Sequence, residues 1–256
     1  MEVINDILGY PNRKIFQDDE CFAFSLDSVM LANFATIRQR DKFILDLGCG
    51  NGVIPLILSL RTNKAIDGVE IQKQLVDMAK KSVDYNGLES QIKIINVDMK
   101  EFVTSDNIEK YDLITCNPPY FKVNEKSYFN LSPQKLIARH EVQITLSDVF
   151  SISKKLLKNN GNLAIVHRTE RLLEIFELFK SNGIEPKRLR FVYEKVNKES
   201  TLVLVEGQKG GKSGLKIENP LILYNNDGKM TEEYSKLIVE VKKWDKIVMM
   251  IVLACI

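Results

Sequence analysis

The stretch that decides the fold is Phe43-Ile44-Leu45-Asp46-Leu47-Gly48-Cys49-Gly50-Asn51-Gly52. Its first five residues form a short apolar run, which predicts a buried strand. The glycines predict a tight turn, and residues 53–58 predict a helix that tolerates Pro55 in its first turn. Glycines at such a turn let a ligand approach the backbone, and the helix start offers N–H groups without helical partners. We therefore expect a small-molecule site at the carboxyl end of this strand.

Acidic residues follow the next two predicted strands. Glu70 ends the run 65–69, about twenty residues after the glycines, where a carboxylate can accept hydrogen bonds from both hydroxyls of a ribose. Asp98 follows the run 92–97, where it could accept a hydrogen bond from an adenine amino group. These two acids predict a cofactor that contains a nucleoside.

The glycine spacing distinguishes between two such cofactors. A nicotinamide dinucleotide needs Gly-x-Gly-x-x-Gly, whereas Gly48, Gly50 and Gly52 alternate and Val53 stands where the last glycine would be. Asp46 would repel a pyrophosphate at the helix N-terminus but would suit an ammonium group. We therefore expect S-adenosylmethionine, with Asp46 and the three glycines at the methionyl part, Glu70 at the ribose and Asp98 at the adenine.

Asn117-Pro118-Pro119-Tyr120 follows the apolar run 111–116, a further predicted strand. The prolines restrict the backbone, so the Asn117 side chain and the Pro118 carbonyl can converge as two acceptors beside an aromatic ring. That arrangement suits a planar amino group attached to a π system, and it makes these four residues the candidate catalytic residues. We also place Asn117 among the cofactor contacts. Alone, the motif fits a strand-end turn with a packed tyrosine equally well.

Together these motifs resemble those of class I S-adenosylmethionine-dependent amino-methyltransferases. Five further segments, residues 24–32, 138–141, 166–168, 189–193 and 219–224, are similar to the bacterial tRNA1(Val) adenine-37 N6-methyltransferases, and the similarity runs over about residues 5–235. The resemblance implies N6-methylation of an adenine in RNA, namely adenosine 37 of a valine tRNA. Glutamine N-methylation of a protein and guanine N2-methylation of ribosomal RNA remain alternatives.

The order of elements predicts the architecture. Amphipathic stretches at 72–86, 146–157 and 171–181 alternate with apolar runs, which favours a parallel sheet with right-handed crossovers. No helix separates runs 189–194 and 201–206, so these should form an antiparallel hairpin. We expect a Rossmann-like α/β class I methyltransferase fold: a seven-stranded, mostly parallel sheet with an antiparallel C-terminal hairpin and helices on both faces. The expected single domain covers residues 1–238, with a helical lead-in at about 26–38, and an atypical apolar tail follows at 239–256.

Composition favours a cytoplasmic enzyme. The chain has 256 residues, of which 45% are hydrophobic, enough for one substantial core. The four cysteines show no paired spacing and there are two histidines, so we expect no disulfide framework and no metal site. The apolar run 247–256 is too short to span a membrane. We expect tRNA as partner, with no membrane and no obligate protein partner.

The net charge is only +2, so a surface for nucleic acid must be local. Residues 180–216 carry nine basic side chains against four glutamates up to residue 206, a pattern that fits phosphate contacts or simply a solvated face. His167 and Arg168 end a predicted strand at the cofactor edge, and Arg139 and His140 follow the Asn-Pro-Pro-Tyr motif. The candidate RNA contacts are therefore Arg139, His140, His167, Arg168, Lys187, Arg188 and Arg190.

Overall fold

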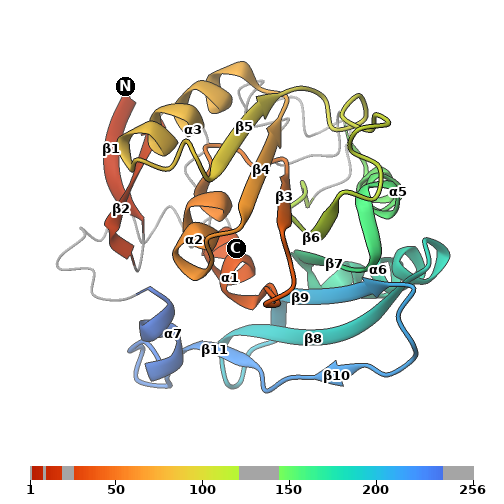
Figure 1. The fold of residues 1–256 in the computed structure, drawn as a ribbon. Coiled ribbons are helices and arrows are strands. Elements are labelled where there is room, and N and C mark those ends of the chain that lie inside the picture. The colour runs from red at the N-terminus through yellow and green to blue at the C-terminus, as the bar shows by residue number, and fades with distance from the viewer. Residues whose placement is uncertain (1, 8–9, 19–25, 121–143, 239–256) are drawn as a thin grey trace, which may run out of the picture.

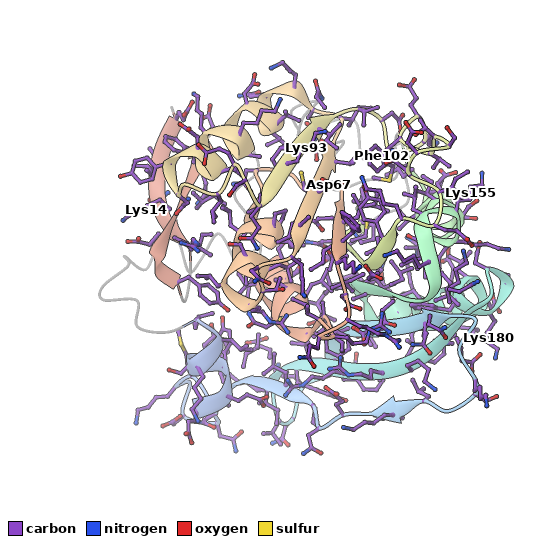
Figure 2. The ribbon with its side chains drawn as sticks, in the orientation of Figure 1. Lys14, Asp67, Lys93, Phe102, Lys155 and Lys180 are labelled. Carbon is purple, nitrogen blue, oxygen red and sulfur yellow. The ribbon has the colours of Figure 1, made fainter. Side chains whose placement is uncertain are left out.

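The computed structural model describes residues 2–7, 10–18, 26–120 and 144–238 (Figure 1). The chain starts with an antiparallel hairpin of β1 (Glu2–Ile7) and β2 (Tyr10–Asp18), which forms a sheet of its own. The sequence analysis did not predict this hairpin. The helix expected at about 26–38 is present as α1 (Leu26–Phe34), which ends four residues earlier than expected. In Figure 2 the hairpin residue Lys14 lies on the opposite side of the molecule from Lys180.

The central elements follow the expected alternation. They are β3 (Phe43–Leu47), α2 (Val53–Arg61), β4 (Ala65–Glu70), α3 (Lys73–Tyr85), β5 (Ile92–Asn96) and β6 (Tyr111–Cys116). After the gap come α5 (Leu146–Leu156), β7 (Leu157–Arg168), the short 3-10 helix η2 (Thr169–Arg171), α6 (Leu172–Ser181), β8 (Ile184–Lys195), β9 (Ser200–Lys209), β10 (Lys216–Ile217), β11 (Leu221–Tyr224) and α7 (Glu232–Leu237).

The main sheet has the strand order β10-β8-β9-β7-β6-β3-β4-β5, and β11 also pairs with β8. Strands β3 to β7 are parallel, and β9 runs antiparallel to both β7 and β8. The seven expected strands are therefore β3 to β9, and the terminal antiparallel hairpin is confirmed. Over the described ranges the sheet has nine strands, because two short segments, β10 and β11, cover the outer edge of β8 in parallel pairing.

Each face of the sheet has its own hydrophobic core. Ile44 of β3 packs on one face with residues of α1, α2 and α3, whereas its neighbour Leu45 packs on the other face with residues of α5 and α6. This follows from the two-residue period of a strand, whose successive side chains point to opposite faces. Helices therefore cover both faces, as expected.

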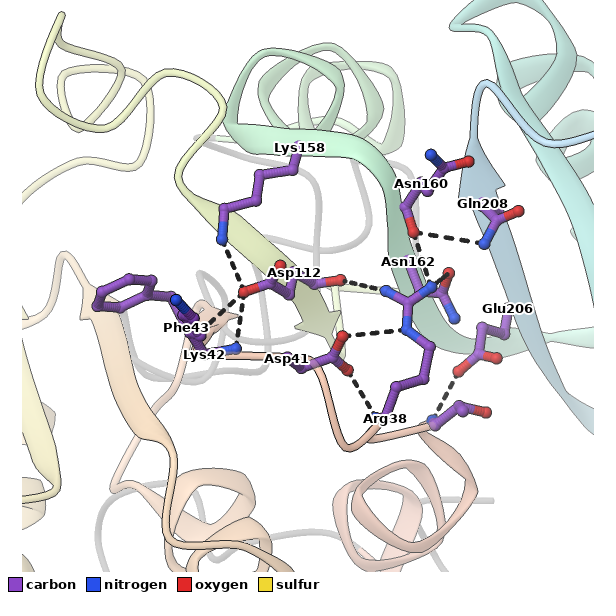
Figure 3. A network of polar contacts seen from close by, with 11 residues as sticks. Arg38, Asp41, Lys42, Phe43, Asp112, Lys158, Asn160, Asn162, Glu206 and Gln208 are labelled. Atoms are coloured by element: carbon purple, nitrogen blue, oxygen red, sulfur yellow. Dashed lines mark hydrogen bonds and ion pairs between the residues drawn. The ribbon is translucent and has the colours of Figure 1, made fainter.

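A polar network ties together the amino ends of the central strands (Figure 3). The Arg38 guanidinium donates to Asp41 at 3.0 Å and to the Asp112 carbonyl at 3.2 Å. The Asp112 carboxylate accepts from the backbone N–H groups of Lys42 and Phe43, at 2.8 and 3.0 Å, and from Lys158 Nζ at 2.9 Å. Because parallel strands all start at this edge, the network leaves the opposite, carboxyl edge for the functional residues.

Candidate active site

The glycine loop directly follows β3. Gly48, Gly50 and Gly52 have φ angles of 70°, 55° and 88°. This left-handed backbone conformation is strained for any residue that carries a side chain. The N–H groups of Gly48 and Cys49 both donate to the Val69 carbonyl, at 2.9 and 3.0 Å, which fixes the loop against β4. A Cβ atom at Gly50 would meet nothing within 4 Å, so the loop backbone is open to a ligand there.

Asp46 lies in β3, two residues before this loop, and is fully buried. Its Oδ1 accepts a hydrogen bond from Thr115 Oγ1 at 2.7 Å, while its Oδ2 has no partner among the described residues. Burial raises the pKa of Asp46 to about 8, and the nearby Glu70 carboxylate contributes to the increase. A buried carboxyl oxygen with no donor is where an ammonium group would be stabilised.

Glu70 ends β4 and is also buried. Its carboxylate accepts from the backbone N–H of Gly50 at 3.0 Å and from that of Gln72 at 2.8 Å. Burial raises the pKa of Glu70, and these two hydrogen bonds oppose the increase. Glu70 therefore shapes the glycine loop, a role the sequence did not indicate, and its carboxylate retains lone pairs that could accept ribose hydroxyls.

Asp98 follows β5 at the same edge and is half-buried. Its Oδ1 accepts from the Lys100 N–H at 2.8 Å, so it starts a turn. Sequence reasoning missed Asn96, whose side-chain amide donates to the carbonyls of Glu70 and Ile71, both at 3.0 Å. These hydrogen bonds link the end of β4 to β5. The sequence did not predict this role, because a polar residue at the end of a strand is common and has no specific meaning by itself.

The Asn-Pro-Pro-Tyr motif lies beside the glycine loop. Cys116, the last residue of β6, pairs with Leu47 of β3, so the motif and the loop leave adjacent strands at the same level. The Asn117 amide nitrogen donates to Ser28 Oγ at 3.0 Å, and the Tyr120 hydroxyl donates to Asp27 Oδ2 at 2.6 Å. Both acceptors lie in the first turn of α1 and are buried, and the sequence analysis assigned no role to either.

Tyr120 also packs on His167 of β7, with ring centroids 5.1 Å apart and an interplanar angle of 52°. His167 is fully buried, and its Nδ1 accepts from the Arg168 N–H at 2.8 Å. Burial and the Arg171 charge lower the pKa of His167 to about 4, so its ring is neutral near pH 7. His167 thus packs against Tyr120 within the protein, and its assignment as an RNA contact stays a prediction from the sequence. The half-buried Arg168 lies close enough to Asp27 for its charge to oppose the rise that burial causes in the pKa of Asp27.

The structure describes three of the other candidate RNA contacts, Lys187, Arg188 and Arg190. Arg139 and His140 lie outside the described residues. Arg168 of β7 and Val192 of β8 both pair with Leu202 of β9, so Val192 lies at the same height as Arg168, at the carboxyl edge. Lys187 precedes Val192 by five residues in β8, which places it ~17 Å from that edge at 3.3 Å per residue. Arg188 forms ion pairs with Glu206 at 3.3 Å and Glu218 at 2.9 Å.

Arg190 is held in the same way, by the Asn219 carbonyl at 2.9 Å and Glu233 at 2.5 Å. The guanidinium groups of Arg188 and Arg190 thus have partners within the protein. Their assignment as RNA contacts stays a prediction from the sequence, and the structure adds a structural role for both.

The described residues contain no helix long and apolar enough to cross a membrane. Within the same ranges, no three histidine, cysteine or acidic side chains gather where a metal ion could be held.

The fold and the site define a class I methyltransferase. The chain superposes on a predicted O-methyltransferase from Agrobacterium tumefaciens with a TM-score of 0.66 and 18% identity, covering 83% of this chain and 95% of that one. TYW2 of Pyrococcus horikoshii, solved in complex with MeSAdo, gives a TM-score of 0.58 at 14% identity, over 82% of this chain and 72% of that one. At these identities the likeness concerns the fold alone.

The sequence identifies the family. Residues 25–181 match the methyltransferase small domain, more than half of the chain, and the protein belongs to that family. It is also 29% identical over 228 residues to a tRNA1(Val) (adenine(37)-N6)-methyltransferase of Tolumonas auensis, covering 88% of this chain and 92% of the relative. The enzyme of the same name from Parabacteroides distasonis is 29% identical over 184 residues, covering 72% of this chain and 76% of the relative.

Proposed function

We propose that this protein is a cytoplasmic enzyme that transfers a methyl group from S-adenosylmethionine to N6 of an adenine in tRNA, namely adenosine 37 of a valine tRNA. One observation carries the reaction class: Asn117-Pro118-Pro119-Tyr120 leaves the sheet beside the glycine loop, on adjacent strands at one level. The names of the relatives support the choice of tRNA and of position 37.

The residues at the carboxyl edge fit the cofactor. Asp46 offers the ammonium group of the methionyl part a buried oxygen that has no partner among the residues the structure describes. The open backbone at Gly50 admits a close ligand, and Glu70 and Asp98 offer carboxylates for the ribose and the adenine. When bound, S-adenosylmethionine supplies a methyl group that its sulfonium has already activated.

The chain has to hold the acceptor nitrogen. The lone pair of an adenine N6 is delocalised into the ring, so this nitrogen is a poor nucleophile. Hydrogen bonds from N6–H to Asn117 Oδ1 and to the Pro118 carbonyl favour a more tetrahedral nitrogen with an exposed lone pair. Because positive charge develops on that nitrogen during transfer, these acceptors stabilise the transition state more than the ground state.

Tyr120 supplies a face for the base. Stacking of a base on an aromatic side chain contributes about 1–3 kcal/mol. A loop adenosine is already partly unstacked, so turning it into the site costs less than extracting a base from a duplex.

The test uses purified protein, methyl-labelled S-adenosylmethionine and two transcripts of a valine tRNA, with adenosine or guanosine at position 37. We expect N6-methyladenosine in digests of the first transcript only, detected by nucleoside mass spectrometry. Equal labelling of both transcripts would place the modification at another nucleotide. Label in N2-methylguanosine of ribosomal RNA, or in a glutamine-containing peptide with none in tRNA, would establish one of the alternative activities instead.

A further inference from the structure

Two consecutive residues at the start of α1 hold the two ends of the Asn-Pro-Pro-Tyr motif. Ser28 Oγ accepts from the Asn117 amide nitrogen at 3.0 Å, and Asp27 Oδ2 accepts from the Tyr120 hydroxyl at 2.6 Å. Asp27 is 9% exposed and Ser28 is 7% exposed, so both hydrogen bonds lie away from bulk water. Neither bond is local, since the partners lie 93 and 89 residues apart in the sequence.

Resting on the proposed function, we propose that Asp27 and Ser28 are positioning residues for methyl transfer: Ser28 sets the amide orientation of Asn117, and Asp27 sets the ring plane of Tyr120. An amide that donates its nitrogen to Ser28 turns its oxygen edge away from that contact, which is the edge that must accept the substrate amino group. A tyrosine whose hydroxyl is bonded cannot swing its ring freely when a base arrives.

The geometry of α1 explains how one short segment serves both ends. Consecutive helical side chains point about 100° apart, so Asp27 and Ser28 diverge and reach two separate points. Pro118 and Pro119 lie between those points and fix two φ angles, so the distance from Asn117 to Tyr120 has little freedom. Holding both ends of a stiff segment fixes the whole segment.

Tyr120 has further restraints on its other sides. The His167 ring lies 5.1 Å from its own, and Arg171 Nη1 lies 3.5 Å from the Tyr120 carbonyl. The Arg171 side chain is itself held by Glu174, with nitrogen–oxygen distances of 2.7 and 3.0 Å. The position of Tyr120 therefore depends on contacts from α1, β7 and η2, and among these contacts only the Asp27 bond involves the hydroxyl group.

The first test is a double-mutant cycle on kcat/KM for tRNA methylation. We expect Asp27→Ala and Tyr120→Phe each to lower kcat/KM about 10-fold, and the double variant to lower it about 10-fold as well, because both remove the same bond. Ser28→Ala should lower kcat about 10-fold with an unchanged Kd for S-adenosylmethionine, and Ser28→Thr, which keeps a hydroxyl, should restore it. The control is Ser153→Ala, which should match wild type. Ser153 is a fully buried serine of α5 whose Oγ has no partner in the described part of the chain.

The second test needs no tRNA. In protein labelled at tyrosine ¹³Cζ, the Tyr120 resonance, assigned by its loss in Tyr120→Phe, should move in Asp27→Ala and stay in place in Ser153→Ala. An unmoved resonance, a double variant about 100-fold impaired, or full activity of Ser28→Ala would overturn the proposal. If wild type fails to methylate tRNA, the proposed function has failed, and the resonance still decides whether Asp27 holds Tyr120.

Discussion

Replacing Asp46 by asparagine should change how the stability of the protein depends on pH. The substitution keeps the shape of the side chain and the oxygen that accepts from Thr115, and it removes the titration. The folded-state pKa of Asp46 is about 8, above its ordinary value of 3.8, so the folded protein keeps a proton that the unfolded chain has lost. The contribution of Asp46 to wild-type stability should therefore fall as pH rises from about 4 to about 8 and stay constant above that.

The magnitude follows from linkage, because each pH unit inside this window costs about 1.36 kcal/mol. Between pH 5 and pH 8, wild type should lose about 4 kcal/mol more unfolding free energy than Asp46→Asn does. The assay is urea unfolding of both proteins at the two pH values, without cofactor. The result to compare is the difference in unfolding free energy between the two proteins at each pH. If that difference changes by less than about 0.5 kcal/mol from pH 5 to pH 8, Asp46 ionises normally and the reasoning is refuted.

Four further outcomes are expected. Glu70→Ala should weaken S-adenosylmethionine binding by about 1.5–3 kcal/mol, the range for hydrogen bonds to a charged group, and calorimetry that shows unchanged affinity would remove its assignment. Asn117→Ala should slow methyl transfer by about 100-fold or more in single-turnover assays and leave cofactor affinity nearly intact. Arg188→Ala should destabilise the fold by about 3–5 kcal/mol in urea unfolding, because it removes the ion-pair partner of the buried Glu206 carboxylate. Adding Glu206→Gln, which removes that buried charge, should recover part of the lost stability. Removal of residues 242–256 should leave methyl transfer intact, and loss of activity in a folded truncation would contradict this.

The sequence predicted the parts of the fold that local pattern determines. The bounds of β3 and β6 coincide with the apolar runs 43–47 and 111–116, because strands buried on both faces read as continuous hydrophobic segments. The N-terminal hairpin has no such signal. Its stability depends on distant partners, since the backbone N–H groups of Lys14 and Phe16 donate to Asn86 and Ser82 of the α3 region, at 3.0 and 2.9 Å.

The sequence likewise predicted only those residues of the candidate site that a local pattern marks. Asp46, Glu70 and Asn117 could be found because each lies within one residue of the end of a strand, and parallel strands bring those positions together. Asp27 and Ser28 could not, because their partners lie about 90 residues away and nothing near them in the sequence marks the contact. The pairing of Arg188 could not be predicted for the same reason, because its partner Glu218 lies 30 residues further along the chain.

The long sequence separations within the site determine when it can form during synthesis. The bonds from Thr115 to Asp46, Asn117 to Ser28 and Tyr120 to Asp27 span 69, 89 and 93 residues. Contacts between residues this far apart close large loops, so they form only when the intervening chain has become ordered, at a cost in conformational entropy. A growing chain that has emerged through β5 carries the glycine loop and Glu70 but none of the residues that would hold an acceptor base. The nascent polypeptide therefore cannot be catalytically active until β6 has paired with β3.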